Sequence, residues 1–146
     1  MIATSIGRSA DRLFVDTSAF YALEDASDEH HEEALAIQRW CGWRRPLLFT
    51  SHHVLDESVT LIGGRLRPDR AGRFAKSLLA SRVIQVVRTD EALEQAALGV
   101  YARLNDGRIS FTDCLSFAVM RALDIPAAFA FDHHFERAGF RRVTPP

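Results

Sequence analysis

Three aspartates of this sequence stand where burial is expected, which is unusual for a charged side chain. Asp16 directly follows the apolar residues 13–15, and Asp132 directly follows the apolar residues 127–131. Asp113 lies near the start of a helical segment that is apolar at most of its positions. Because an ionised carboxylate taken out of water is costly unless it is paired, each of these acids requires a hydrogen bond, a cation or a metal.

A fourth acid is one of two neighbours, Asp56 and Glu57, on a predicted helix. The apolar stripe of this helix runs through Val54, Leu55, Val59, Leu61 and Ile62. Helical spacing places Glu57 at the border of that stripe and turns Asp56 further towards solvent. Glu57 is therefore the predicted site residue of the pair.

Four carboxylates that converge would define a particular chemistry. Within a few ångströms they repel one another, which raises their pKa values or demands a cation, and hard oxygen ligands favour Mg²⁺ or Mn²⁺ over zinc or copper. A metal held in this way activates water and positions a phosphodiester for hydrolysis. Each acid taken singly also fits a plainer role, as a turn former, a helix cap or a partner of the helix dipole.

Strands and helices are predicted to alternate along the chain. The predicted strands are 13–15, 47–49, 83–87 and 127–131, with a closing segment at 140–143. The predicted helices are 19–23 capped by Ser18, 28–40, 52–62 ended by the pair Gly63-Gly64, 68–79, 90–104 and 112–123. This order predicts a three-layer α/β/α sandwich with a mainly parallel sheet of four to five strands. Ligands of such sheets bind beyond the carboxyl ends of the strands, where Asp16 and Asp132 are expected.

Length and composition predict one globular domain over residues 1–146. The chain is 47% hydrophobic and 25% charged, and its two cysteines, Cys41 and Cys114, have no disulfide or zinc spacing. No export signal or bilayer-length segment is found, so a cytoplasmic protein without membrane association is expected. The net charge of -1 lacks the broad basic field that is typical of nucleic-acid binders.

Four short motifs occur in the order that a known family shows. They are Val-Asp-Thr-Ser at 15–18, Val-Leu-Asp-Glu at 54–57, Ser-Phe-Thr-Asp at 110–113 and Phe-Asp-His-His-Phe at 131–135. Together they resemble the PIN-domain family, and in particular its small bacterial members, the VapC-like toxins. The resemblance runs from Leu13 to Val143, which leaves residues 1–12 as an N-terminal extension.

The resemblance implies a PIN-like α/β/α sandwich and a Mg²⁺- or Mn²⁺-dependent endoribonuclease that acts as the toxin of a toxin-antitoxin pair. RNA substrate, a cognate antitoxin and a homodimer are the implied partners. The implied metal ligands are Asp16, Asp113 and Asp132, with Glu57 holding a metal or its water. The threonines beside Asp16 and Asp113 would support the site by hydrogen bonds.

Other polar residues are expected to have structural roles. Neighbouring histidines on a helix diverge, so the pairs at 30–31, 52–53 and 133–134 each offer at most one imidazole, and His134 is expected to be a turn residue. The arginines at 65, 67, 70 and 73 could grip phosphate, although an ordinary solvated face is the favoured interpretation.

Aromatic residues suggest a protein-binding surface. Trp40, Trp43 and the aromatics around Phe74 fit a dimer or antitoxin contact.

Two other functions fit parts of the pattern. A phospho-accepting receiver domain also places aspartates at strand ends, but it needs a lysine at a late strand end, and Lys76, the only lysine, falls in a predicted helix. A PIN-like module that binds RNA or protein without cutting is the more serious alternative. The intact acids at all four motif positions speak against it.

Overall fold

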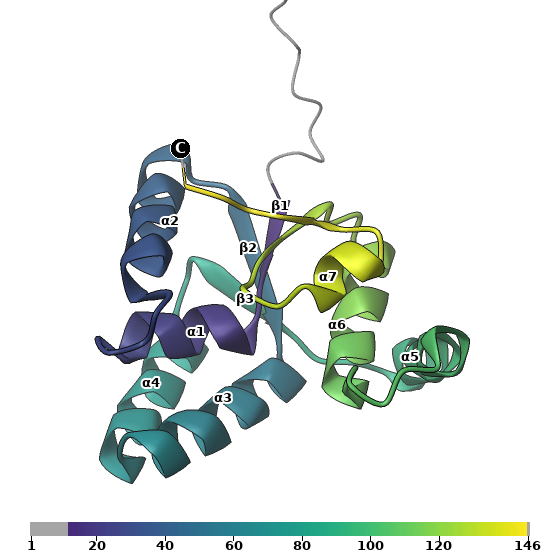
Figure 1. The fold of residues 1–146 in the computed structure, drawn as a ribbon, viewed down its shortest axis with the longest axis horizontal. Coiled ribbons are helices and arrows are strands. Elements are labelled where there is room, and N and C mark those ends of the chain that lie inside the picture. Colours follow the sequence, from purple (N-terminus) through teal and green to yellow (C-terminus); the bar gives the residue numbers. More distant parts are fainter. Residues whose placement is uncertain (1–11, 146) are drawn as a thin grey trace, which may run out of the picture.

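The computed structural model describes residues 12–145 and is built around one parallel sheet (Figure 1). The strands are β1 (Arg12–Val15), β2 (Leu47–Ser51), β3 (Ile84–Val87), β4 (Ala127–Phe129) and β5 (Arg141–Arg142). Their order in the sheet is β3-β2-β1-β4-β5, and every neighbouring pair is parallel. The predicted parallel sheet of four to five strands is confirmed.

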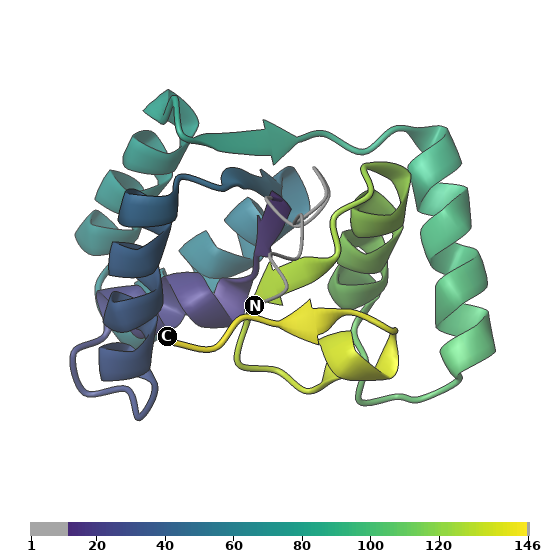
Figure 2. The ribbon, with the colours of Figure 1, turned by 90° about the horizontal axis from the view of Figure 1, so that it is seen from above.

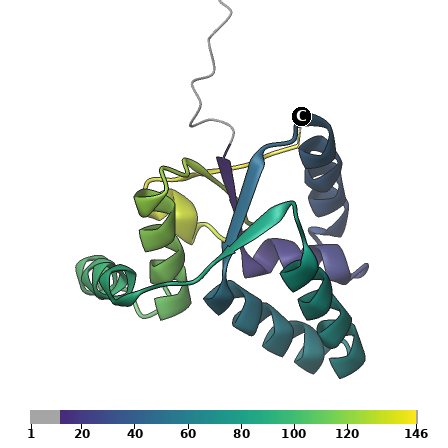
Figure 3. The same ribbon diagram turned by 180° about the vertical axis from the view of Figure 1, so that it is seen from behind.

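The described residues form seven helices around the sheet. They are α1 (Thr17–Glu24), α2 (His31–Arg44), α3 (His52–Arg65), α4 (Pro68–Ala80), α5 (Glu91–Leu104), α6 (Phe111–Ala122) and α7 (His134–Arg137). Helices α1, α2 and α4 lie on one side of the sheet, and α5, α6 and α7 lie on the other (Figures 2 and 3). Helix α3 leaves the carboxyl end of β2 and packs against α1 and α4. The predicted three-layer α/β/α arrangement is confirmed.

Two predicted helix boundaries are wrong because side chains and packing override local signals. Helix α1 begins at Thr17 with Asp16 as its N-cap, two residues before the predicted cap at Ser18. Helix α3 runs through Gly63 and Gly64 to Arg65. A helical glycine costs about 1 kcal/mol relative to alanine, which packing can offset, and the Gly63 backbone lies against Ala71 of α4.

Three further differences concern the ends of two elements and one additional short helix. Helix α2 begins at His31 rather than at residue 28, since Asp28 accepts a hydrogen bond from the backbone N–H of His30 in a turn. Strand β4 ends at Phe129, so Asp132 follows it after two intervening residues instead of directly. The short helix α7 was not predicted from the sequence pattern.

The core is richest around β1 and α6. Residues 113–120 of α6 are all buried, as the apolar pattern predicts. The fully buried ring of Phe135 packs between Phe14 and Phe117, with ring centroids 6.5 and 5.2 Å away. Phe135 therefore packs α7 against both the sheet and α6.

The predicted N-terminal extension at 1–12 lies outside the described residues except for Arg12, which begins β1. Within residues 12–145, no helix has the length and apolar character needed to cross a membrane.

Replacing Phe135 by alanine is expected to lower the free energy of unfolding by about 3–5 kcal/mol, because it leaves a cavity between β1, α6 and α7. Urea unfolding of the metal-free protein measures this loss. Phe111→Ala is the matched control, since this ring is exposed and should change stability by less than about 1 kcal/mol. Equal losses in the two variants would contradict the role given to Phe135.

Candidate metal centre

The four predicted acids come from four different segments and meet at the carboxyl edge of the sheet, where α1, α3 and α6 begin (Figure 1). Asp16 directly follows β1, Glu57 lies in the second turn of α3, and Asp113 lies in the first turn of α6. Asp132 lies in the loop between β4 and α7. The charge of Asp113 acts on Asp16 and Glu57, and the charge of Asp132 acts on Glu57 and Asp113. The four acids are therefore near enough for their charges to interact, and Asp113 and Asp132 are the two whose oxygens lie together in one cluster within 4.8 Å, with His134 as its third member.

Asp16 caps α1 with one of its two oxygens. Its Oδ2 accepts hydrogen bonds from the backbone N–H of Ser18 at 3.2 Å and from the Ser18 hydroxyl at 2.7 Å. The same hydroxyl accepts from the backbone N–H of Phe131 at 3.0 Å. Ser18 therefore connects Asp16 to the loop that carries Asp132.

Asp113 forms a capping box with Ser110 at the start of α6. Its Oδ2 accepts from the backbone N–H of Ser110 at 3.0 Å, and the Ser110 hydroxyl accepts from the backbone N–H of Asp113 at 3.0 Å. Asp113 therefore has two roles: it caps the start of α6, and it is one of the neighbouring acids of the site.

Asp132 and His134 form a tight local unit. The backbone N–H of His134 donates to Asp132 Oδ1 at 2.8 Å, and the ring Nδ1 of His134 lies 3.1 Å from the same oxygen. This Nδ1 also lies 3.3 Å from Asp113 Oδ2. The backbone of His134 takes the turn role that was expected, but its ring also joins the acids, which sequence reasoning missed. No spacing rule reveals that contact, because Asp113 lies 21 residues away along the chain.

Glu57 rather than Asp56 faces the site, as helical phase predicts. Glu57 is half-buried near Thr17 and Thr112, whose hydroxyls partly oppose the rise of its pKa on burial, whereas Asp56 is exposed. The hydroxyl of Ser58 donates in turn to Thr17 at 3.3 Å.

Burial and mutual repulsion raise the pKa values of three of the acids, Asp16, Glu57 and Asp113. Burial raises the pKa of Asp16 to about 7, and the nearby charges of Asp113 and Glu57 add to this rise. Burial likewise raises the pKa values of Glu57 and Asp113. In residues 12–145, no arginine or lysine forms an ion pair with any of the four acids. The site therefore has an excess of negative charge that a cation would relieve.

Each of the three aspartates has one carboxylate oxygen available to bind a hard metal ion. Each of the three aspartates uses one oxygen for its local hydrogen bonds, while Asp16 Oδ1, Asp113 Oδ1 and Asp132 Oδ2 accept none from described residues. One ligand atom each from Asp113, Asp132 and His134 can be chosen so that all lie within 4.8 Å of one another. Carboxylate oxygens are the ligands that Mg²⁺ and Mn²⁺ prefer.

His31, His53 and the lysine are engaged elsewhere. His31 Nδ1 contacts the carbonyl of Ala22, and His53 Nε2 contacts the hydroxyl of Thr89. Lys76 lies within α4, as predicted, and so provides no strand-end lysine of the kind a receiver domain needs.

The arginines around the α3–α4 junction are mostly engaged within the protein. Arg67 and Arg73 both pair with Asp69, and Arg70 pairs with Glu24. The guanidinium of Arg65 lies over the ring of Tyr21. These contacts fit an ordinary solvated face, the favoured interpretation, better than a phosphate-binding role for the arginines.

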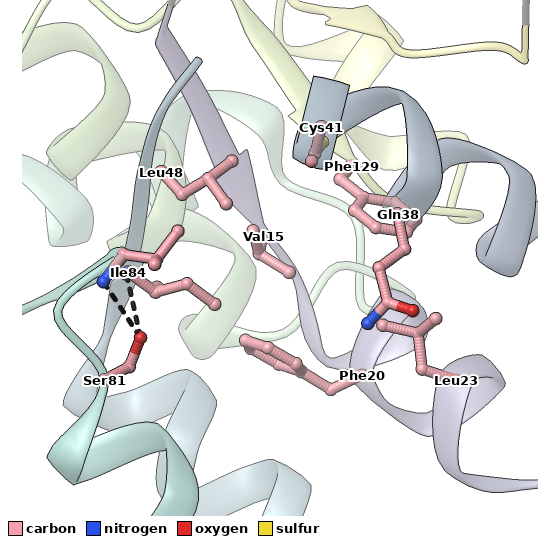
Figure 4. Close-up of a pocket in the computed structure, with 11 residues that line it drawn as sticks. Val15, Phe20, Leu23, Gln38, Cys41, Leu48, Ser81, Ile84 and Phe129 are labelled. Carbon is pink, nitrogen blue, oxygen red and sulfur yellow. Dashed lines mark hydrogen bonds between the residues drawn. The ribbon is translucent and has the colours of Figure 1, made fainter. Parts of the chain in front are cut away.

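An apolar cavity of about 250 Å³ lies on the opposite side of β1 from α6. Val15, Phe20, Leu23 and Cys41 are among the residues that line it (Figure 4). None of the four acids lines this cavity, so it is separate from the candidate metal centre.

The aromatic residues expected at a surface differ in exposure. Phe74 is buried against Phe20, and Trp40 is half-buried, so neither offers a full ring to a partner. Trp43 is 77% exposed.

The raised pKa of Asp16 predicts that the metal-free protein loses stability as the pH rises from about 4 to about 7. Over this range the folded state retains a proton that the unfolded state, with its ordinary carboxyl pKa of 3.8, has already lost. The free energy of unfolding should fall by up to about 1.4 kcal/mol per pH unit for this one proton. Urea unfolding in EDTA at several pH values measures the slope.

Asp16→Asn keeps a capping side chain and should weaken this dependence, because the amide does not titrate. Asp56→Asn is the control, since the exposed Asp56 side chain should leave the slope unchanged. A wild-type stability that stays flat or rises between these pH values would contradict the prediction.

Comparisons with known proteins agree with this geometry. The PIN domain family matches residues 13–141. The chain is 39% identical over 133 residues to the 23S rRNA-specific endonuclease VapC20 of Mycobacterium tuberculosis, covering 91% of this chain and 98% of that protein. It is 31% identical over 125 residues to a VapC ribonuclease of Archaeoglobus fulgidus, covering 83% and 77%.

A solved structure shows the same fold. The crystal structure of VapC20 from Mycobacterium tuberculosis, described as a sarcin-ricin loop cleaving toxin, superposes with a TM-score of 0.82 at 38% identity, covering 91% of this chain and 99% of that one. Sequence, fold and the converging acids thus agree, and the chain belongs to the PIN-domain family.

Proposed function

We propose that this protein is a metal-dependent endoribonuclease of the VapC type, which hydrolyses phosphodiester bonds of RNA. The observation that carries the proposal is a group of four neighbouring acids without a lysine or arginine partner among the described residues. In each aspartate, one carboxylate oxygen accepts no hydrogen bond from these residues. The relatives described as endonuclease and ribonuclease support RNA as the substrate class.

The proposed roles follow from the environment of each acid. Asp16, Asp113 and Asp132 would hold Mg²⁺ or Mn²⁺ directly through their free oxygens, and Glu57 would hold a metal or its water. When bound, the metal lowers the pKa of water and neutralises charge on the leaving oxygen. Thr17 and Thr112, which lie near the Glu57 carboxylate, would support it by hydrogen bonds. Protons held by the raised-pKa acids must leave before a cation binds, so acidic pH should oppose metal binding.

The biological role is proposed from the relatives. VapC20 is described as specific for 23S rRNA, which makes ribosomal RNA the first substrate to test. We further propose a toxin that acts in the cytoplasm, forms a homodimer and is inhibited by a cognate antitoxin, as the family resemblance implies. A PIN-like module that only binds RNA or protein would have no need of a cation-demanding acidic cluster.

Asp113→Asn should lower cleavage of ribosomal RNA by about 100-fold or more, because it removes a metal ligand. The amide can still accept the capping hydrogen bond from Ser110, so folding should be preserved. Purified wild type and variant are incubated with total cellular RNA in Mg²⁺, in Mn²⁺ or in EDTA, and the cleaved ends are mapped. Equal cleavage in all of these reactions, or a wild type that cuts no RNA with either metal, would refute the nuclease.

Glu57→Gln should also lower cleavage strongly, because the amide has no charge with which to hold a metal or its water. Asp56→Asn is a matched control on the same helix and should cleave at the wild-type rate. The comparison tests the choice of Glu57 over Asp56 as the site residue of α3. Loss of activity in the Asp56 variant alone would reverse that choice.

A further inference from the structure

We propose that His134 is a positioning residue that holds Asp113 and Asp132 at the separation that metal binding requires. The inference rests on the proposed function and adds a fifth side chain to the four acids. It starts from one contact, the ring Nδ1 of His134 lying between the two carboxylates, 3.1 Å from Asp132 Oδ1 and 3.3 Å from Asp113 Oδ2.

The chemistry of the two neighbours sets the role of the ring. Ionised carboxylates only accept hydrogen bonds, so Nδ1 must carry the hydrogen. It donates this hydrogen to Asp113 Oδ2, and Asp132 Oδ1 lies 3.1 Å from the same nitrogen. Asp113 and Asp132 otherwise repel each other, and the Asp132 charge contributes to the raised pKa of Asp113. His134 offsets this repulsion by placing its ring N–H at Asp113 and its backbone N–H at Asp132, and so links two acids that come from separate segments of the chain.

The choice of oxygens makes His134 a positioning group rather than a competitor of the metal. The ring contacts Asp113 Oδ2, which already accepts from the backbone N–H of Ser110, and Asp132 Oδ1, which already accepts from the backbone N–H of His134. Asp113 Oδ1 and Asp132 Oδ2 accept no hydrogen bond from residues 12–145. The ring thus fixes each carboxylate through one oxygen and leaves the other oxygen for a cation.

Helix α7 is anchored well enough to hold the ring in place. Phe135 is fully buried, Arg137 pairs with Asp106, and Arg121 donates to the backbone carbonyl of Ala138 at 2.9 Å. The His134 side chain is 22% exposed, whereas the side chain of its neighbour His133 is 80% exposed and lies near Glu136. His133 is therefore a natural control for effects of histidine in general.

The test is calorimetric titration of the full chain with Mn²⁺, compared among variants that move the donor atom. His134→Ala removes the donor, His134→Asn keeps an amide N–H near the Nδ1 position, and His134→Gln places its amide further out, near the Nε2 position. Loss of a group that orients metal ligands typically weakens metal affinity by about 10–100-fold, which is expected for the Ala and Gln variants. The Asn variant and His133→Ala should bind within about threefold of wild type, since both keep the donor.

Cleavage kinetics give a second measurement. In the Ala variant the Mn²⁺ concentration needed for half-maximal activity should rise in parallel with Kd, while activity at saturating Mn²⁺ recovers most of the wild-type value. Melting curves in EDTA check that each variant is folded. A merely structural role would lower the melting temperature without this selective change in metal requirement.

Two results would overturn the inference while leaving the proposed function intact. One is wild-type Mn²⁺ affinity in His134→Ala. The other is rescue by Gln and not by Asn, which would make His134 a direct ligand through Nε2. If the wild type itself binds no Mn²⁺, the proposed function fails and the inference fails with it.

Discussion

Mutual repulsion among four carboxylates at the carboxyl edge of the sheet is the constraint on which the other features of this site depend. Taking such groups out of water requires hydrogen bonds to each charge. Here the bonds are local: Asp16 caps α1, Asp113 closes a capping box on α6, and Asp132 binds the backbone of the turn before α7. Because each uses one oxygen in this way, the same residues can begin helices and still offer ligands.

The sheet topology explains why these helix starts lie together. Strand order reverses between β1 and β4, which lie side by side in the middle of the sheet, and ligand sites of open parallel sheets form at such a reversal. The backbone N–H of Asp16 donates to the carbonyl of Phe129 at 3.1 Å, so the end of β1 is joined to the end of β4. Buried packing of α6 and of Phe135 then holds Asp113 and α7 against these strands.

Charge is distributed so that the site remains without a permanent counter-ion. The arginines near the α3–α4 junction pair with Asp69 and Glu24, and Arg108 and Arg137 pair with Asp106. Burial and the absence of such a partner keep the pKa values of Asp16, Glu57 and Asp113 raised, an unfavourable state that cation binding would relieve. Function and stability are in this sense opposed at the site, as is common where charged groups are preorganised.

The sequence by itself determined the alternation of strands and helices, the choice of Glu57 over Asp56 and the set of four acids, because apolar periodicity and strand-end positions are local properties. Only the tertiary structure decided that α3 continues through Gly63 and Gly64, where the neighbouring α4 compensates for poor helix propensity. It also decided that the ring of His134 bridges Asp113 and Asp132. Contacts of this kind depend on how distant segments pack in space, and no local pattern of residues carries that information.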